Sequence, residues 1–131
     1  MKNLSILIFL LALLSFSCQQ KPFKQGEILY QNFCSNCHMD DGTGLEGVIP
    51  PLANADYVKE NQDMLACIIK NGMEGEIIVN GQKYNAPMVG SEDALSDFEI
   101  TNIINYINHS WGNNYGYQKL ENTRKSLSEC K

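Results

Sequence analysis

The feature that most constrains this chain is a short motif in which Cys34 and Cys37 are separated by two residues and followed directly by His38. One helical turn presents both sulfurs to the edge of a porphyrin and places the imidazole beneath its iron. The motif therefore predicts a covalently attached haem, bound through Cys34 and Cys37, with His38 as one axial ligand of the iron.

Two other kinds of site use a pair of cysteines at this spacing. A thioredoxin-like dithiol lies in a βαβ pattern, which the flanking sequence lacks. A structural zinc site needs a second closely spaced pair, whereas Cys67 and Cys130 stand far apart in the chain. Haem attachment is the favoured interpretation, with the dithiol and the zinc site as its alternatives.

Length and charge limit the remaining possibilities. The chain has 131 residues, which suits one small domain with a modest core. A haem would add a large apolar plate to that core. The formal net charge is −5, so the chain has no excess of positive charge to neutralise phosphates, and we expect no nucleic-acid partner. An acidic surface instead suits redox protein partners with a basic docking face.

The first seventeen residues resemble a signal peptide. Lys2 is followed by an apolar run over residues 4–16, which is too short to be a stable membrane span. The step from Ser17 to Cys18 resembles the lipobox of bacterial lipoproteins, in which the cysteine is acylated and becomes the mature N-terminus. We therefore expect export to the periplasmic side of a bacterial membrane, with a lipid anchor at Cys18. An ordinary signal peptide cleaved nearby is the alternative.

Apolar periodicity predicts mainly helices in the mature chain. The capping box formed by Ser96 and Glu99 starts the strongest of them, and Gly112 is expected to end it. A short hairpin with an Asn80-Gly81 turn interrupts the helical pattern. In chain order we expect a polar tether over 18–23, helices over 24–37 and 61–71, the hairpin over 75–84, a helix over 96–112, and a polar extension over 113–131 with one more helix around 117–127.

The segment leading into the motif resembles the opening of class I c-type cytochromes, in which a glycine and an aromatic residue precede the two cysteines at fixed spacing. Gly26 and Tyr30 stand at those positions. The resemblance covers residues 24–112 and implies an all-α fold of three to five helices around one covalently bound haem c, with the hairpin before a methionine ligand loop. It also implies that Gly26 lets the first and last helices cross closely, with Tyr30 and Tyr106 packed at the crossing.

The segment that begins with Pro50 and Pro51 resembles the part of that family in which a proline carbonyl accepts a hydrogen bond from the ligand histidine. Such an acceptor would fix the tautomer of His38 and make it a stronger donor to iron. We expect the carbonyl of Pro51 to have this role, with that of Pro50 as the alternative.

The second axial ligand decides the function, because a haem closed by a thioether carries electrons whereas an open site binds small molecules or peroxide. Met88 follows Pro87 in a loop far from His38 and resembles the family's ligand methionine, so we expect it to bind the iron. Met73 is the alternative ligand. Met64 lies on an apolar stripe, where packing in the core is the usual role.

Three further residues have candidate roles. Cys67 and Cys130 would both reach an oxidising compartment, where they are candidates for a disulfide that straps the C-terminal extension to the third helical stretch. Free thiols are the alternative. His109 lies near the end of the last long helix, where an imidazole interacts favourably with the terminal carbonyls, so we expect a surface cap and not a haem ligand.

These observations together predict an exported monohaem c-type cytochrome that carries single electrons between membrane-associated or periplasmic redox partners. It would be a carrier and not an enzyme, with no catalytic residue and no small-molecule substrate. Two alternatives remain open: the haem subunit of a dehydrogenase or terminal oxidase complex, and a haem peroxidase or sensor with an open site.

Overall fold

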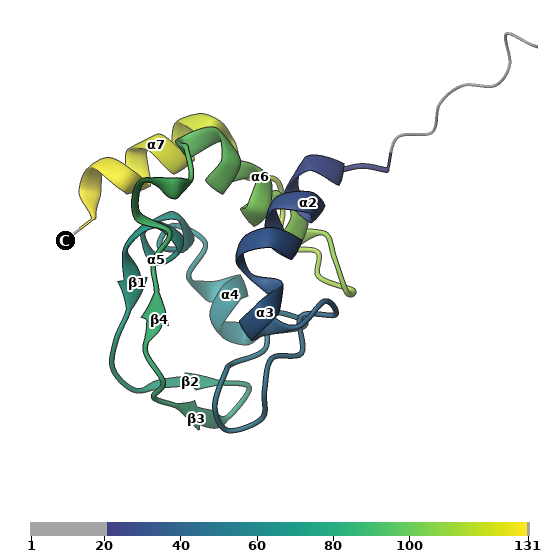
Figure 1. The fold of residues 1–131 in the computed structure, drawn as a ribbon, viewed down its shortest axis with the longest axis vertical. Helices are drawn as coiled ribbons and strands as arrows, with labels where there is room; N and C mark the ends of the chain where they lie inside the picture. The colour runs from purple at the N-terminus through teal and green to yellow at the C-terminus, as the bar shows by residue number, and fades with distance from the viewer. Residues whose placement is uncertain (1–20, 131) are drawn as a thin grey trace, which may run out of the picture.

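The computed structural model describes residues 21–130. The expected signal peptide, residues 1–17, and the lipidation candidate Cys18 lie outside this range. The helices are α2 (Lys24–Phe33), α3 (Ser35–His38), α4 (Asp56–Glu60), α5 (Leu65–Asn71), the 3-10 turn η1 (Glu92–Ala94), α6 (Asp97–Asn108) and α7 (Leu120–Glu129). The strands are β1 (Gly72–Met73), β2 (Ile77–Val79), β3 (Gln82–Tyr84) and β4 (Met88–Val89) (Figure 1).

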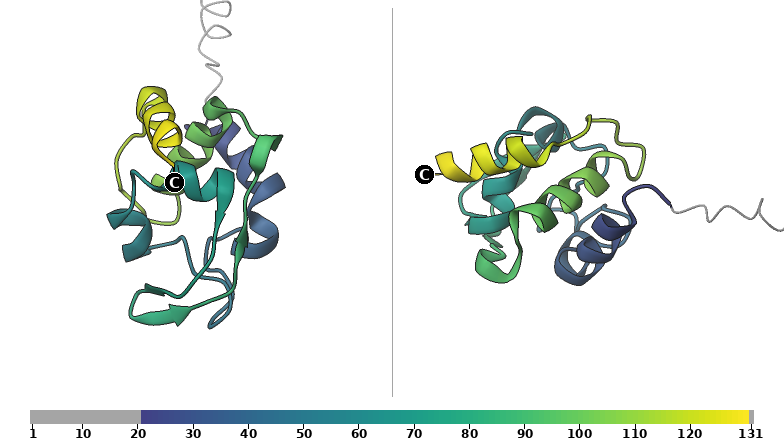
Figure 2. Two further views of the ribbon diagram at one scale, coloured as in Figure 1. Left: turned by 90° about the vertical axis from the view of Figure 1, so that its left-hand side faces the viewer. Right: turned by 90° about the horizontal axis from the view of Figure 1, so that it is seen from above.

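The described residues form a helical fold with two small antiparallel pairs, β2 with β3 and β1 with β4. Helices α2 and α6 pack together, α7 packs on α5 and α6, and the β2·β3 hairpin lies at the opposite end (Figures 1 and 2). The expected all-α fold with one small hairpin is confirmed. Among residues 21–130, no helix has the length and apolar character needed to span a membrane.

The crossing of α2 and α6 depends on the absence of a side chain at Gly26. A Cβ atom there would collide with the carbonyl oxygen of Asn102 and the Cβ of Tyr106. Tyr30 is fully buried one turn later, and its ring centroid lies 5.3 Å from that of Tyr106. Gly26, Tyr30 and Tyr106 therefore have the packing roles that the resemblance implied.

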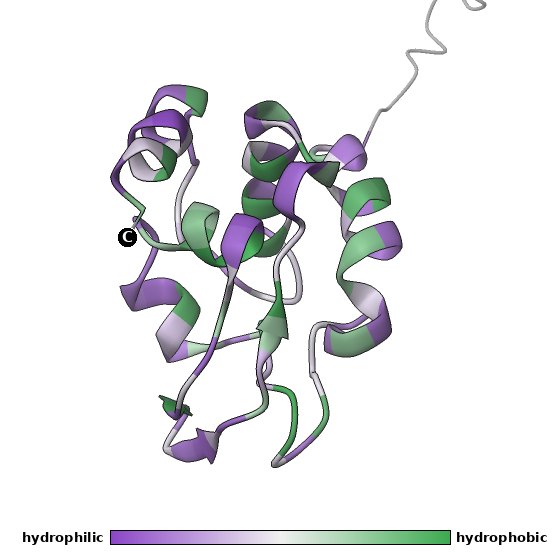
Figure 3. Cartoon of the chain, turned by 60° about the vertical axis from the view of Figure 1, so that its left-hand side comes forward, coloured by the Kyte–Doolittle hydropathy of each residue, from purple (hydrophilic) through white to green (hydrophobic). Residues whose placement is uncertain are grey.

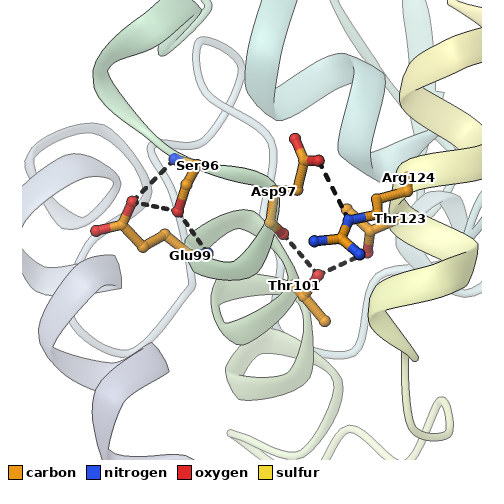
Figure 4. Close-up of polar contacts among 6 residues, drawn as sticks. All are labelled: Ser96, Asp97, Glu99, Thr101, Thr123 and Arg124. Atoms are coloured by element: carbon orange, nitrogen blue, oxygen red, sulfur yellow. Dashed lines mark hydrogen bonds and ion pairs between the residues drawn. The ribbon is translucent and has the colours of Figure 1, made fainter.

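Helix α6 begins as the sequence predicts and ends earlier. The Ser96 side chain accepts from the Glu99 backbone, and the Glu99 carboxylate accepts from Ser96, so the capping box is present (Figure 4). The helix stops at Asn108, not at Gly112. The His109 N–H bonds back to the Tyr106 carbonyl at 3.2 Å, which tightens the last turn and ends the helix.

Beyond α6, Trp111 adopts a positive φ of 53°. Its indole packs against Gly42 and Tyr30 and donates from Nε1 to the Asp40 carbonyl at 3.1 Å. Trp111 is therefore half-buried through this tertiary contact and does not continue the apolar face of α6.

Two other helix boundaries differ from expectation. The first helical stretch is broken at Cys34, whose φ of −120° separates α2 from α3. The stretch expected over 61–71 begins only at Leu65, and the separate helix α4 precedes it. Asn61 ends α4 because its side-chain amide donates to the Tyr57 carbonyl at 2.8 Å. A polar side chain that bonds to the preceding turn competes with continued helix.

The chain enters the fold at Phe23, directly before α2. Phe23 has a φ of 62°, and its ring stacks on that of His109 with a centroid distance of 4.4 Å. The Nδ1 of His109 lies 2.8 Å from the Asn105 carbonyl, so the imidazole bonds to its own helix, as expected for a cap.

The C-terminal extension is an integral part of the fold. Its helix α7 spans Leu120–Glu129, and Cys130 forms a disulfide with Cys67 of α5, with an S–S distance of 2.03 Å and a Cα–Cα distance of 5.7 Å. The Ser126 hydroxyl donates to the Asp63 carbonyl. Figure 3 shows α7 as a largely hydrophilic helix, which agrees with its place on the outside of α5 and α6.

Polar side chains on α6 hold this extension. Thr101, Asn105 and Asn108 recur at helical spacing on the side of α6 that faces residues 113–130, and all three are buried. The hydroxyl oxygens of Thr101 and Thr123 are 2.9 Å apart (Figure 4). Asn105 exchanges two hydrogen bonds with the backbone of Gln118, at 2.9 and 2.8 Å. Hydrogen bonds from α6 thus hold the extension, together with the disulfide and the packing of Tyr115 and Leu127 against the core.

Candidate haem site

The two motif cysteines and His38 lie on the single turn of α3 and the residue before it. The backbone N–H of His38 donates to the Cys34 carbonyl at 2.9 Å, which closes the turn. Cys34, Cys37 and His38 all line one cavity of about 410 Å³. Both cysteines are free of disulfides, and Cys37 is exposed while Cys34 is half-buried. Two thiols and an imidazole therefore border the same space.

His38 is held in one tautomer. The side chain is only 7% exposed, and its Nδ1 lies 3.0 Å from the Pro50 carbonyl oxygen. A carbonyl only accepts, so Nδ1 carries the proton and Nε2 keeps a lone pair for a metal. Burial lowers the pKa of His38 against the opposing effect of the Pro50 hydrogen bond, which favours the neutral imidazole that metal binding requires.

The acceptor carbonyl belongs to Pro50, and the expectation for Pro51 is wrong. The backbone N–H groups of Leu52 and Ala53 both donate to the Gly42 carbonyl, at 2.7 and 2.9 Å, which folds residues 42–53 back on α3. Because Pro50 precedes another proline, its backbone is biased to an extended conformation. Consecutive carbonyls of such backbone point in different directions, so only one of the two faces His38.

The cavity walls are apolar. A smaller cavity of about 70 Å³ adjoins the larger one, and both are bordered by Cys34, His38, Pro50, Ile69, Met73, Ile77 and Met88. Leu95, which is 4% exposed, and Tyr84, which is 5% exposed, complete the wall of the larger cavity. Such a lining suits a large, flat apolar group better than a polar substrate.

One buried polar atom on this wall has no partner. The Ser91 hydroxyl is the only buried side-chain nitrogen or oxygen atom in residues 21–130 that makes no hydrogen bond. Ser91 also lines the larger cavity. Because protein atoms cover this hydroxyl, it makes no contact with the cavity itself. The fit to a covalently attached haem therefore depends on the two thiols, the imidazole and the apolar walls.

Met88 reaches the cavity from β4, which pairs with β1 at the end of α5. The Cα partners are Gly72 with Val89 and Met73 with Met88. A Cβ on Gly72 would collide with the Met88 carbonyl, and one on Gly90 would collide with the Lys70 carbonyl. These two glycines let the strand carrying Met88 lie directly against the end of α5. Nothing in the sequence pattern indicated this strand pair, although two isolated glycines flanking apolar residues are compatible with a close backbone approach.

The dithiol and zinc alternatives do not fit the structure. Burial raises the pKa of the Cys34 thiol to about 12, and the nearby Cys37 adds to the rise, whereas a reactive dithiol needs a lowered pKa. No group of three or more His, Cys, Asp or Glu side chains within residues 21–130 could hold a metal ion. Cys67 and Cys130 are joined to each other and cannot supply the second half of a zinc site.

Two other candidates lie away from the cavities. His109 is absent from the lining of both cavities, and it stacks on Phe23. Met64 is 49% exposed, so the expectation that it packs in the core is wrong. It is the N-cap residue of α5 and therefore lies outside the helix.

Comparison with known proteins agrees with this site. Residues 23–111 match the family model described as cytochrome c. The chain is similar to cytochrome c-552 of Thermus thermophilus, with 36% identity over 83 residues that are 60% of this chain and 63% of the relative. It is also similar to the cytochrome c subunit of a quinone alcohol dehydrogenase of Gluconobacter oxydans, with 34% identity over 91 residues that are 68% of this chain and 19% of that protein.

The chain thus spans less than two thirds of the length of each of these relatives. The family match nevertheless covers well over half of the chain and includes the cavity-lining turn of α3, the ladder of β1 and β4, and helix α6. The chain belongs to the cytochrome c family: it is a c-type cytochrome, an electron-transfer protein that carries covalently bound haem c.

Proposed function

We propose that the protein carries single electrons between redox proteins on the periplasmic side of a bacterial membrane. In this proposal Cys34 and Cys37 bind the haem covalently, and His38 and Met88 are the axial ligands of its iron. The observation that carries the proposal is that an imidazole with a free Nε2 and a thioether, from two distant parts of the chain, border the same apolar cavity.

The haem supplies the reversible one-electron chemistry, and the chain sets the conditions for it. The Pro50 carbonyl holds the Nδ1 proton of His38, which orients the ring. The apolar walls exclude water, and a thioether ligand raises the potential. If His38 and Met88 both bound the iron, the haem would have no position left for a substrate. This distinguishes a carrier from a peroxidase or a gas sensor.

The cavity reaches the surface beside exposed apolar side chains. Phe33 is 50% exposed and Val48 is 47% exposed, and both line the larger cavity. A haem edge near these residues would be accessible to a docking protein. The formal net charge of −5 favours a partner with a basic docking face, because opposite charges raise the rate of encounter.

A spectrum of protein made with the haem-attachment machinery tests the ligand set. The oxidised protein should show the near-infrared band of thioether-ligated haem, and its pyridine haemochrome should have the position of a haem joined by two thioethers. A Cys34→Ala/Cys37→Ala variant should keep no haem on the polypeptide after extraction with acidified organic solvent, whereas the wild type should keep it. High-spin features and no near-infrared band in the wild-type protein would favour the open-site alternative.

We further propose an exported lipoprotein, with a signal peptide over 1–17, a lipid at Cys18, a tether over 18–23, a haem domain over 24–112 and the C-terminal extension over 113–131. The apolar run before Cys18 supports this. Cys18→Ser should move the protein from the membrane fraction to the soluble fraction. Mass spectrometry of the mature N-terminal peptide should find an acylated Cys18, and an unmodified N-terminus would exclude the anchor.

A role as a subunit of a larger complex is the second candidate. It is favoured by the similarity to the cytochrome c subunit of a quinone alcohol dehydrogenase. Solubilisation in mild detergent followed by size-exclusion chromatography separates the two. A free carrier should elute alone, whereas a subunit should elute with a dehydrogenase or oxidase.

A further inference from the structure

A second methionine side chain lies beside Met88 in the haem cavity. Met73 borders both cavities that Met88 borders, and both side chains are half-buried. The two residues are direct Cα partners in the antiparallel pair of β1 and β4. Directly opposed residues of such a pair project to the same face, with Cβ atoms about 5 Å apart. Two thioethers are therefore presented to the cavity from adjacent backbone positions.

The alternation along β4 supports this orientation. Val89, the residue after Met88, is 88% exposed and borders only the larger cavity, whereas Met88 is half-buried and borders both cavities, so the Met88 side chain is the one directed inward. The register is fixed by close backbone contacts, because Gly72 and Gly90 each fit where a Cβ would collide with backbone atoms. The backbone N–H of Ser91 also donates to the Ile69 carbonyl at 2.8 Å. The pair therefore cannot slip by one residue and turn either methionine outward.

We propose that Met73 is a reserve axial ligand, whose sulfur binds the haem iron when Met88 does not. This rests on the proposed function, in which Met88 is the resident ligand. The two donors are chemically identical, and an unbranched thioether side chain with three rotatable bonds can adjust its reach by rotation alone. In the resident state the Met73 side chain packs against the haem as an apolar wall. Loss of the Met88 bond then leaves a thioether, and not water, as the nearest donor.

Four forms of the full-length holoprotein test the proposal: the wild type, Met88→Ala, Met73→Leu, and the double variant. Leucine at position 73 keeps the volume and the apolar character, so its effect reports the sulfur. We expect the near-infrared thioether band and a low-spin ferric haem in the wild type, in Met73→Leu and in Met88→Ala. The double variant should lose the band and become high-spin. Met64→Leu combined with Met88→Ala is the matched control and should keep the band, because Met64 lies outside both cavities.

Added imidazole gives a second measurement, because it must displace any internal ligand. We expect the double variant to bind imidazole at least about tenfold more tightly than Met88→Ala does. Equal affinities, together with high-spin Met88→Ala, would overturn the reserve role while leaving Met88 as the ligand. Loss of the band in Met73→Leu would make Met73 the resident ligand and also overturn the proposal. Absence of the band in the wild type would instead refute the proposed function, and the reserve role with it.

Discussion

The two sides of helix α6 are buried in opposite ways. On one side, apolar residues such as Ile103 and Ile107 face the core around the haem cavity, which the protein chain alone does not fill. On the other side, Thr101, Asn105 and Asn108 are equally buried but are covered by the C-terminal extension. We call these the haem side and the strap side of α6.

The difference lies in what completes each side. The side chains on the haem side are apolar, so this side is covered best by an apolar group that fits the cavity. On the strap side, each buried polar side chain has its own hydrogen-bond partner, and the disulfide between Cys67 and Cys130 links the end of the extension to α5. Burial of polar groups is tolerated when each has a partner. One helix can therefore be stabilised by a cofactor on one face and by the chain's own hydrogen bonds on the other, which makes the two faces separable by experiment.

The largest effect is expected from loss of the haem. In Cys34→Ala/Cys37→Ala without bound haem, the apolar walls of the cavity of about 410 Å³ lose the apolar group that would cover them and stay in contact with water. Because the free energy of unfolding of a typical domain is only about 5–15 kcal/mol, this loss should strongly destabilise the protein. Hydrogen exchange should show protection lost from β1, β4 and residues 45–52, and retained longest between α6 and α7. Equal loss of hydrogen-exchange protection on both sides of α6 would contradict the view that the two sides are stabilised separately.

The disulfide should give the next largest effect, restricted to the strap side. Cys67→Ser/Cys130→Ser opens a link with a sequence separation of 63, for which chain entropy suggests about 4 kcal/mol. Denaturant unfolding of the holoprotein should move to lower concentration by the corresponding amount. The absorption spectrum of the folded protein should stay that of the wild type, and an altered near-infrared band would show that the two sides are coupled. Reduction of the wild-type protein is the matched control.

Loss of one strap-side amide should cost less. Asn108 is fully buried, and its side chain exchanges hydrogen bonds with that of Gln62 and donates to the Gly116 carbonyl at 3.0 Å. Asn108→Ala leaves these partners unsatisfied and should lower the free energy of unfolding by about 2 kcal/mol. The control is Asn102→Ala, on a more exposed part of the same helix, which should change it by less than about 0.5 kcal/mol. Equal changes in the two variants would mean that the buried hydrogen bonds of Asn108 do not contribute to the free energy of unfolding.

The smallest effect is expected at the start of α6, which belongs to both sides. Ser96→Ala removes the capping box and should cost about 1 kcal/mol. Because the cap supports the whole helix, hydrogen exchange should become faster by a similar factor on both sides. Glu99→Gln keeps a side-chain oxygen that can still accept from Ser96, so this variant should cost less than Ser96→Ala. Faster hydrogen exchange on one side alone would indicate that the cap stabilises the contacts of only that side of α6.

Sequence reasoning was most successful where the chemistry is local. The fold class, the haem cofactor, the Asn80-Gly81 hairpin and the capping box at Ser96 all depend on residues close together in the chain, and each was predicted. The roles of Cys34, Cys37, His38 and Met88 as haem ligands stay predictions. The choice between Pro50 and Pro51 was wrong because the direction of a carbonyl depends on the path of a whole loop.

On the strap side, the Cys67–Cys130 disulfide and a helix in the extension were expected and are present, but the polar contacts with α6 were missed for a different reason. Residues 113–130 are too polar for periodicity to indicate burial, and their partners lie elsewhere in the chain. One signal was available: Thr101, Asn105 and Asn108 form a polar stripe at helical spacing, and these residue types are typical of a side that bonds to backbone. Helix α4 and the pair of β1 and β4 are too short to have a periodic pattern, so only tertiary contacts define them.

The stack of Phe23 on His109 has a mechanical consequence for the mature protein. It pins the point where the chain joins the fold, and in Figure 1 this point lies at the end of the molecule away from the β2·β3 hairpin. If Cys18 carries a lipid as proposed, the five peptide steps from Cys18 to Phe23 span at most about 18 Å. The haem domain then stays within that distance of the membrane surface. It can exchange electrons only with proteins whose redox centres lie close to the same surface.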